Sequence, residues 1–417
     1  MKELTMEQWE KKYLVEAEKK RFDRKNNRPG RGLEDGSFLG DIKDKAGFTQ
    51  QDQALRWGAR RGTVISRFSS KPASSPPDDE AGGSVASSSP DQALASAMSR
   101  GGSATAVASP PEKVAAVASP AKPAGGASPA GMNLNYKPPE GLKIDTSEPE
   151  IITRDIKKVA RYFGADLVGV CKLDRRWVYE DGNIPEEYEY AIVMAYEEDY
   201  ELIKHFPSYI SDAATSMGYS DMAVTNTYLT SFIENLGFKA IASGNDTALS
   251  VPMAIQAGLG DHGRLGFLIT PQFGPRVRLS KVFTDLPLVV DSPIDFGVTE
   301  FCAACKKCAK LCPSQSIPYG DRTTEANNTS NSAGELKWRI NAESCRMYWG
   351  QVNKPCTTCM ACCPYNKPNT WPHKTTRWFT DHARWADPFY IKMDELFGYG
   401  KPMKSGDLEK FWNEWHP

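Results

Sequence analysis

The 417-residue sequence lacks several features that would assign it to a common class of protein. No run of 18 or more apolar residues occurs, so no segment is predicted to span a membrane. No G-x-G-x-x-G run opens a helix after a strand and no Walker A run is present, so nucleotide sites of those kinds are not indicated. Lys and Arg total 51 against 52 Asp and Glu. This balance argues against a protein that works mainly by attracting a phosphate backbone.

Aromatic residues are missing between Phe68 and Tyr136. Within 71–130, 43 of the 60 residues are Ser, Ala, Pro or Gly. A segment of this composition cannot bury enough apolar surface to offset its chain entropy. The sequence therefore predicts a flexible linker over 70–138, which separates an N-terminal segment, 1–69, from the main body.

An export signal is not visible at the N-terminus. Residues 1–20 contain no continuous apolar stretch, and polar residues follow the twin arginine Arg60-Arg61. The sequence therefore predicts either a cytoplasmic protein or a mature form whose leader was removed.

The main body alternates between two apolar periodicities. Helical spacing predicts helices over 151–164 and 219–236, each ended by a glycine. Short apolar runs predict buried strands at 165–171, 190–196, 238–242, 265–270 and 278–284. This alternation favours a layered domain of α/β (α+β) class, which we place over 139–296.

Nine of the ten cysteines lie between positions 302 and 363. The first run is Cys302-x2-Cys305-x2-Cys308-x3-Cys312-Pro313. It matches the bacterial ferredoxin run that binds [4Fe–4S] clusters, in which the fourth cysteine binds the other cluster. Two-residue gaps let neighbouring thiolates surround one face of a cubane, and the proline turns the chain afterwards.

A second run, Cys345-x10-Cys356-x2-Cys359-x3-Cys363-Pro364, keeps the last two ferredoxin intervals and lengthens the first. By the same crossover, cluster 1 is predicted on Cys302, Cys305, Cys308 and Cys363, and cluster 2 on Cys312, Cys345, Cys356 and Cys359. Cys362 is left over, because Cys363 is the residue followed by proline.

Disulfides and zinc are the alternatives to iron–sulfur clusters. Zinc also uses C-x2-C pairs, but eight cysteines with two Cys-Pro endings favour two clusters. Cys171 lies in an apolar strand and is interpreted as a core residue.

The stretch 244–287, GNDTALSVPMAIQAGLGDHGRLGFLITPQFGPRVRLSKVFTDLPL, together with the two cysteine runs resembles the corrinoid-dependent reductive dehalogenases. FGADLVGV (163–170), CRMYWG (345–350) and CCPYNK (362–367) support this likeness, which covers about 150–400. Residues 47–62 resemble the segment that follows the leader in exported members. The resemblance therefore implies a mature exported protein, attached peripherally to the outer face of the cytoplasmic membrane.

Family membership would imply the fold, the cofactors and the reaction. The expected fold is a nitroreductase-like corrinoid-binding domain, then a ferredoxin-like domain (297–372) with two [4Fe–4S] clusters, and a C-terminal segment (373–417). The implied activity removes halide from a small organohalide, a chlorinated ethene in the tetrachloroethene type. Implied partners are a low-potential electron donor and a small membrane anchor protein, with a homodimer as one oligomeric state.

The resemblance also implies a catalytic trio. Carried over residue by residue, the proton donor falls on Tyr219, the Gly-Asn-Asp asparagine on Asn245, and the arginine after Phe-Gly-Pro on Arg278. Arg276 competes with Arg278, and Tyr228 with Tyr219. Taken alone, each residue has an ordinary interpretation: a packing tyrosine, a turn asparagine and a surface arginine.

The remaining implied contacts are less specific. Trp349 would line the substrate pocket, and Ser243, Gly244, Gly258 and Gly260 would allow a corrinoid to approach the backbone closely. Ordinary turns explain such glycines equally well. The D-x-H-x-x-G pattern of lower-axial histidine binding is absent, so a corrinoid without a protein histidine on cobalt is expected.

The chemistry of the trio suits reductive dehalogenation. A phenol with an ordinary pKa near ~10 keeps its proton at neutral pH and can release it to a carbanion-like centre. A nearby arginine would stabilise the tyrosinate, and an asparagine amide can donate to the halogen without adding charge.

Two rival functions remain. An epoxyqueuosine reductase uses the same cofactors and a similar CP-x-N-K ending, but acts on tRNA with an aspartate as proton donor. The neutral net charge and the long N-terminal extension argue against it. A ferredoxin-like electron carrier fused to an inert domain is the other rival, and a cobalt measurement separates it from either enzyme.

Overall fold

The structure is a computed structural model of the chain, and it describes residues 1–16, 21, 143–352, 354–368, 382–404 and 407–414. The predicted linker (70–138) and the segment 47–62 lie outside these described residues. In the described part of the chain, no helix is long and apolar enough to cross a membrane.

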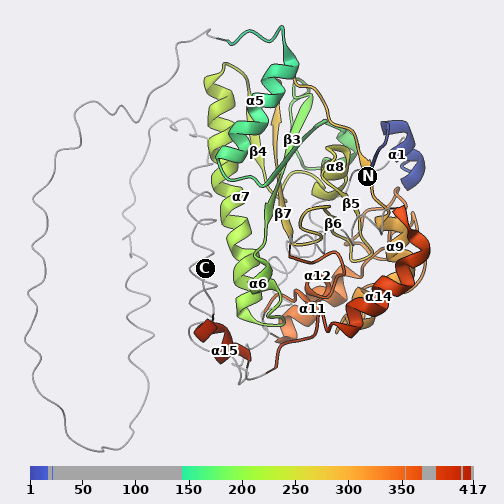
Figure 1. Ribbon diagram of the computed structural model, residues 1–417. Helices are drawn as coiled ribbons and strands as arrows, with labels where there is room; N and C mark the ends of the chain where they lie inside the picture. The colour runs from blue at the N-terminus through green and yellow to red at the C-terminus, as the bar shows by residue number, and fades with distance from the viewer. Residues whose placement is uncertain (17–20, 22–142, 353, 369–381, 405–406, 415–417) are drawn as a thin grey trace, which may run out of the picture. The chain divides into compact units, whose positions relative to one another are not determined.

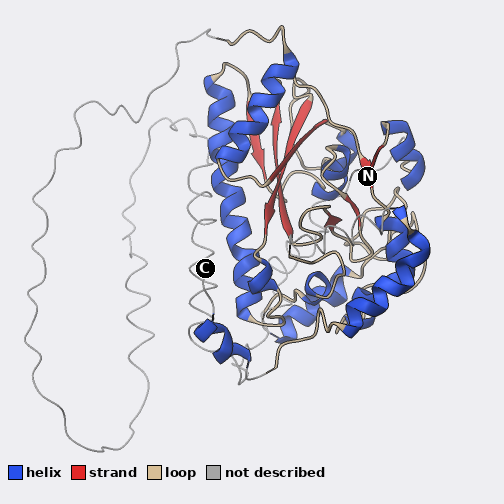
Figure 2. Ribbon diagram, in the orientation of Figure 1, coloured by secondary structure: helices blue, strands red, loops and turns tan. Residues whose placement is uncertain are grey.

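A four-stranded antiparallel sheet forms the centre of the body, as Figure 2 shows. Its order is β2 (Leu167–Lys172), β3 (Tyr190–Glu197), β7 (Val277–Thr284) and β4 (Ala240–Ser243). Every neighbouring pair is antiparallel, with Tyr196 opposite Arg278 in the β3–β7 register.

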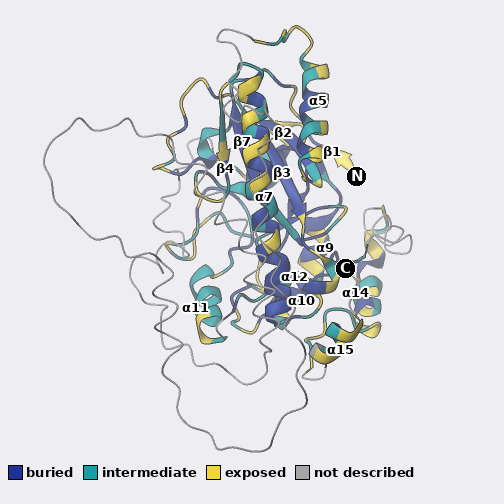
Figure 3. Ribbon diagram, turned by 90° about the vertical axis from the view of Figure 1, so that its left-hand side faces the viewer, coloured by how far each residue is buried: buried dark blue, intermediate teal, exposed yellow. Residues whose placement is uncertain are grey.

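Helices cover both faces of this sheet (Figure 1). The helices α5 (Pro149–Tyr162) and α7 (Tyr209–Asn235) pack on one face, and α8 (Ser250–Gln256) packs on the other. Side chains of β3 alternate accordingly: Ile192 and Met194 join the α5–α7 core, while Val193 joins the α8 core. Figure 3 shows β3, at the centre of the sheet, as buried along most of its length.

The sequence-based elements agree with the structure except in length. The predicted helix over 219–236 begins ten residues earlier, at Tyr209. Its first half is polar or small, yet nearly all of it is buried. A segment buried on every side has no amphipathic pattern, so the pattern could not reveal its start. The strand expected over 265–270 contracts to β6 (Leu268–Ile269), which pairs with β5 (Asp261–His262).

The first residues of the chain pack against this body. β1 (Lys2–Glu3) pairs with β8 (Ile294–Asp295), and α1 (Met6–Tyr13) begins with a Thr5–Gln8 capping box. Trp9 is 2% exposed and meets the Trp177 ring edge-on at 6.1 Å. Lys12 forms ion pairs with Asp261 at 2.9 Å and Asp295 at 3.2 Å. Residues 1–16 therefore belong to the α8 side of the body.

The cysteine-containing region and the C-terminal segment are built mainly from short helices. These are α9 (Val298–Cys305), α10 (Lys307–Leu311), α11 (Ala342–Val352), α12 (Thr358–Ala361), η3 (Arg384–Ala386), α14 (Asp387–Leu396) and α15 (Asp407–Glu414). Two further short helices, η2 (Arg175–Trp177) and α6 (Tyr200–Ile203), lie earlier in the chain. The buried half of α7 faces this region, where Thr357 Oγ1 and Ser211 Oγ lie 3.0 Å apart.

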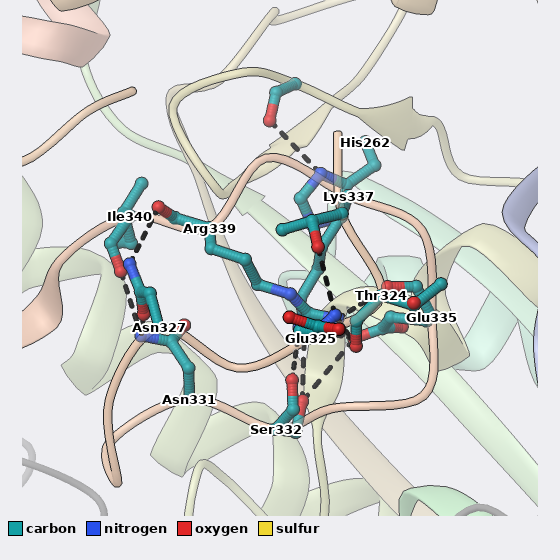
Figure 4. A network of polar contacts seen from close by, with 12 residues as sticks. His262, Thr324, Glu325, Asn327, Asn331, Ser332, Glu335, Lys337, Arg339 and Ile340 are labelled. Atoms are coloured by element: carbon teal, nitrogen blue, oxygen red, sulfur yellow. Dashed lines mark hydrogen bonds and ion pairs between the residues drawn. The ribbon is translucent and has the colours of Figure 1, made fainter. Parts of the chain in front are cut away.

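A buried polar network holds the loop between Cys312 and Cys345 (Figure 4). Arg339 donates to backbone carbonyls at Ser332 and Thr324, and Lys337 pairs with Glu335. His262 lies beside this network, where burial and then the Lys337 charge lower its pKa to about 3. His262 is therefore a neutral, buried imidazole at neutral pH.

The docking of α1 can be tested by substitution. Trp9→Ala removes a fully buried aromatic side chain, which typically costs about 3–5 kcal/mol of stability. We expect a lower thermal unfolding midpoint for Trp9→Ala, and little change for Met6→Ala, because Met6 is 41% exposed on the same helix. Equal midpoints for the two variants, measured by circular dichroism, would show that α1 does not pack on the body.

Candidate active site and cysteine-lined cavity

Three side chains from separate elements meet at one end of the sheet. Tyr219 comes from the middle of α7, Arg278 from β7, and Asn245 from the loop after β4. Arg278 Nη1 lies 3.5 Å from Tyr219 Oη, and Asn245 Nδ2 lies 3.3 Å from the same oxygen. Two donors therefore face one phenol oxygen. Asn245 is exposed and Tyr219 is half-buried, so the trio lies at the surface of the body.

A glycine in α7 makes room for this arrangement. A Cβ on Gly218 would lie 2.8 Å from Arg278 Cγ, closer than real side chains come. Glycine within a helix costs about 1 kcal/mol relative to alanine. The absence of a side chain at Gly218 leaves the space through which Arg278 reaches Tyr219. The Arg278 guanidinium carbon lies 4.5 Å from the centre of the Tyr219 ring.

A buried carboxylate holds the arginine. Glu198 is 1% exposed and pairs with Arg278, with Nε and Oε1 2.7 Å apart. Burial alone lowers the pKa of Arg278, but the charges around it, of which Glu198 is the strongest, together with the Glu198 hydrogen bond more than compensate and leave the pKa above its ordinary value. Burial raises the pKa of Glu198, and the Arg278 charge opposes that rise. The cation is thus fixed beside Tyr219.

The structure distinguishes between the residues that the sequence analysis offered as alternatives. Arg276 is fully buried and pairs with Glu197, and its guanidinium lies over the Tyr200 ring, away from Tyr219. Tyr228 is 53% exposed and packs on Phe163. Arg278 and Tyr219, rather than Arg276 and Tyr228, meet Asn245.

Trp349 does not join this group. It lies on α11, half-buried, with the Arg346 guanidinium 5.5 Å from its ring centre. Among the described residues, it makes no hydrogen bond or ring contact with Tyr219, Asn245 or Arg278. Its place in a substrate pocket stays a prediction.

The four positions expected to contact a corrinoid fall into two groups. Ser243 and Gly244 directly precede Asn245, and a Cβ on Gly244 would meet only the flexible end of Met222, at 3.2 Å. A Cβ on Gly258 would lie 2.6 Å from the Ser292 carbonyl oxygen, and one on Gly260 would lie 2.2 Å from the Ile269 carbonyl oxygen. Contact with the protein's own backbone is sufficient to explain these last two glycines.

Four cysteines line one cavity in the C-terminal half. They are Cys302, Cys305, Cys308 and Cys363, the set that the crossover pattern predicts for cluster 1. Arg264 also lines this cavity, and its Nε donates to the Cys302 carbonyl at 2.9 Å. A buried cation is therefore held next to four thiols, where it would balance the charge of a bound anionic cluster.

The second predicted set is also gathered. Cys345 lies near enough to Cys356 and Cys312 for their charges to act on it, and Cys359 near enough to Cys356 and Cys345, although Cys362 and Cys308 also act on Cys359. In the described part of the chain, no three Cys, His, Asp or Glu side chains converge closely enough to hold a single metal ion. In a cubane each thiolate binds a different iron at a different corner, so the lack of a single-ion site does not conflict with cluster sites at the two sets.

Burial raises the pKa of the Cys305 thiol to about 11 and of the Cys308 and Cys345 thiols to about 12. Without iron, they would keep their protons at neutral pH, so cluster binding must displace those protons. Cys362 is buried behind its neighbour, with Sγ near the Cys359 carbonyl at 3.7 Å, and does not line the cavity.

Sequence reasoning missed the residues that support the trio. Glu198, Gly218, Ser250 and Lys281 lie around it, and the sequence analysis assigned none of them a role. The available signal was a charged residue within or next to a strand that is otherwise apolar. Glu198 follows β3, and Lys281 lies in the middle of β7.

Comparison with known proteins finds that the chain is similar to reductive dehalogenases. No family model matches. A solved reductive dehalogenase, described as suggesting a mechanism for B12-dependent dehalogenation, shares the fold with a TM-score of 0.58 and 30% identity, over 63% of this chain and 39% of that one. The chain is therefore a homologue of this class of protein.

Two curated relatives indicate which type of reductive dehalogenase the chain resembles. Tetrachloroethene reductive dehalogenase of Sulfurospirillum multivorans is 38% identical over 307 residues, and that of Desulfitobacterium hafniense is 37% identical over 333. The matches cover 65% and 66% of this chain and 60% of each relative. An epoxyqueuosine reductase of Lactococcus garvieae matches only 28% of the chain, at 29% identity. The resemblance to the tetrachloroethene type is confirmed, and the chain spans about 60% of those relatives' length.

The two groups of glycines predict different outcomes. Gly260→Ala would collide with a backbone carbonyl, so we expect a markedly lower unfolding midpoint even in the cofactor-free chain. Gly244→Ala meets only a methionine end and should fold normally. If Gly260→Ala folds like the unaltered chain and loses only corrinoid binding, the packing explanation is wrong.

Proposed function

We propose that the chain is a reductive dehalogenase that removes halide from a small organohalide, a chlorinated ethene in the first instance. The observation that carries the proposal is the meeting of Tyr219, Asn245 and Arg278 at an exposed edge of the sheet. The homology to tetrachloroethene reductive dehalogenases and the two gathered thiol sets support it.

The proposed reaction replaces a carbon–halogen bond by a carbon–hydrogen bond, and it consumes two electrons and one proton while releasing halide. A cobalt corrinoid supplies the low-potential electrons for bond cleavage when bound. Tyr219 gives the proton from Oη to the carbon. Arg278 stabilises the tyrosinate that remains, and Glu198 keeps the guanidinium in place. Asn245 has a second N–H, beyond the one facing Tyr219, with which it can bind the halogen.

The same proposal assigns the cofactor sites. Residues 139–296 would form the nitroreductase-like corrinoid-binding domain, with Ser243 and Gly244 beside the macrocycle. Residues 297–372 would form the ferredoxin-like domain, with Cys302, Cys305, Cys308 and Cys363 on cluster 1 and Cys312, Cys345, Cys356 and Cys359 on cluster 2. A low-potential donor, a small anchor protein and a position on the outer face of the cytoplasmic membrane complete the proposal.

The direct experiment is anaerobic purification with corrinoid, followed by an assay on tetrachloroethene with a reduced viologen. Halide release that depends on both cofactors supports the proposal. Turnover of epoxyqueuosine-tRNA without dehalogenation would favour the tRNA-modifying enzyme. A chain that binds iron but no cobalt would be an electron carrier.

Metal content tests the ligand sets. Eight ligands for two [4Fe–4S] clusters predict about eight irons and one cobalt per chain, measured by elemental analysis. Cys363→Ala should lose iron, because Cys363 lines the cavity, whereas its neighbour Cys362 does not, and Cys362→Ala should keep its iron. The opposite pattern would exchange the two cysteines, and zinc in place of iron would contradict the clusters altogether.

The proton donor is tested by removing one oxygen. Tyr219→Phe keeps the ring over which Arg278 lies, and general-acid catalysis contributes roughly 10²–10⁴-fold. We expect turnover to fall by about that factor with normal iron and cobalt contents. Arg278→Lys loses the planar fork and should fall nearly as far. Arg276→Lys should affect stability more than turnover, because Arg276 points away from Tyr219. A fully active Tyr219→Phe would mean that another group supplies the proton.

A further inference from the structure

A buried lysine lies beneath the loop that carries Asn245. Lys281 projects from β7 on the α8 face, opposite to Arg278. Its Nζ donates to the Gly244 carbonyl at 2.5 Å, the Ala248 carbonyl at 3.2 Å and Ser250 Oγ at 2.8 Å. The three N–H groups of an ammonium thus meet three acceptors. Asp246 and Cys171 are the ionisable groups that act on it.

These contacts fix the direction of a hydrogen-bond chain. An ammonium cannot accept a hydrogen bond, so Ser250 Oγ is the acceptor toward Lys281 and its own hydrogen is left to donate. Asn245 Oδ1 lies 3.3 Å from Ser250 Oγ and accepts that hydrogen. The amide is therefore oriented with Nδ2, rather than its oxygen, toward Tyr219.

This chain of hydrogen bonds ends at the Tyr219 hydroxyl. Tyr219 Oη faces Asn245 Nδ2 on one side and Arg278 Nη1 on the other, and neither group can accept a proton. The phenol hydrogen is consequently left for a third partner. If the amide were reversed, its oxygen would capture that hydrogen and would also face the halogen with an acceptor.

We propose that Lys281 and Ser250 are positioning residues that fix the polarity of the Asn245 amide, so that the Tyr219 proton and an amide N–H both remain available to an organohalide. This inference rests on the proposed function. Burial lowers the pKa of Lys281 to about 8, so the donating ammonium is the main form at neutral pH.

The test compares Ser250→Ala, Ser250→Thr and Lys281→Met in the cofactor-loaded enzyme. Thr227→Ala is the control, since that exposed hydroxyl on α7 bonds only the Ala223 carbonyl. Ser250→Ala should lower kcat by about tenfold, because the Asn245 amide is no longer held with its N–H toward the developing tyrosinate. Ser250→Thr should restore kcat, and Lys281→Met should act like Ser250→Ala. Ser250→Ala keeps the test decisive if Lys281→Met does not fold.

A second measurement does not depend on dehalogenation. The ring signal of Tyr219 in ¹³Cζ-tyrosine-labelled holoprotein, identified by its loss in Tyr219→Phe, is followed against pH. Loss of a donor to the phenolate should move its midpoint upward by about one pH unit in Ser250→Ala. An unchanged midpoint and kcat, or no rescue by Ser250→Thr, would overturn the inference. A shifted midpoint with a fully active Tyr219→Phe would uphold the hydrogen-bond chain and overturn the proton-donor role.

Discussion

The placement of three cations on or next to one central strand is the constraint on which this site depends. β7 pairs with β3 along its whole length and with β4 over its second half; it carries Arg278 and Lys281, and Arg276 directly precedes it. An unpaired charge in such a position is costly, so each cation must be met by fixed acceptors. Arg276 pairs with Glu197, and Arg278 with Glu198. Lys281 is met by two carbonyls and a hydroxyl.

The alternation of a strand turns this constraint into a geometry. Arg278 and Lys281 lie on opposite faces of the sheet, because residues three apart in a strand point in opposite directions. One reaches Tyr219 on the α7 side, and the other supports the Asn245 loop on the α8 side. At this edge of the sheet, hydrogen-bond donors therefore act from both faces. A phenol placed there keeps its own hydrogen free.

The sequence could predict the trio only through resemblance, and the reason lies in distance along the chain. Tyr219, Asn245 and Arg278 have no common motif, and their meeting depends on strand order and on Gly218. The cysteine sets could be assigned from spacing alone, because ferredoxin intervals encode the crossover locally; Cys302, Cys305, Cys308 and Cys363 do line one cavity, and the ligand roles of both sets stay predictions. The strands near 190–196 and 278–284 were also predictable, since apolar runs mark buried strands. The start of α7 and the docking of Trp9 were not, because both depend on burial by distant elements.

The cysteine-lined cavity and the sheet are joined by close backbone approach and by one buried arginine. A Cβ on Gly274, three residues before β7, would lie 2.3 Å from the Tyr365 carbonyl oxygen, next to Cys363 in sequence. Arg264 donates to the carbonyls of Cys302 and Pro318 while lining the cavity. The loop that leads into the Arg278 strand thus packs directly on the segment that would hold cluster 1. In the proposed enzyme, electrons and the Tyr219 proton would have to reach the same place, and this contact would hold the two sites in a fixed relative position.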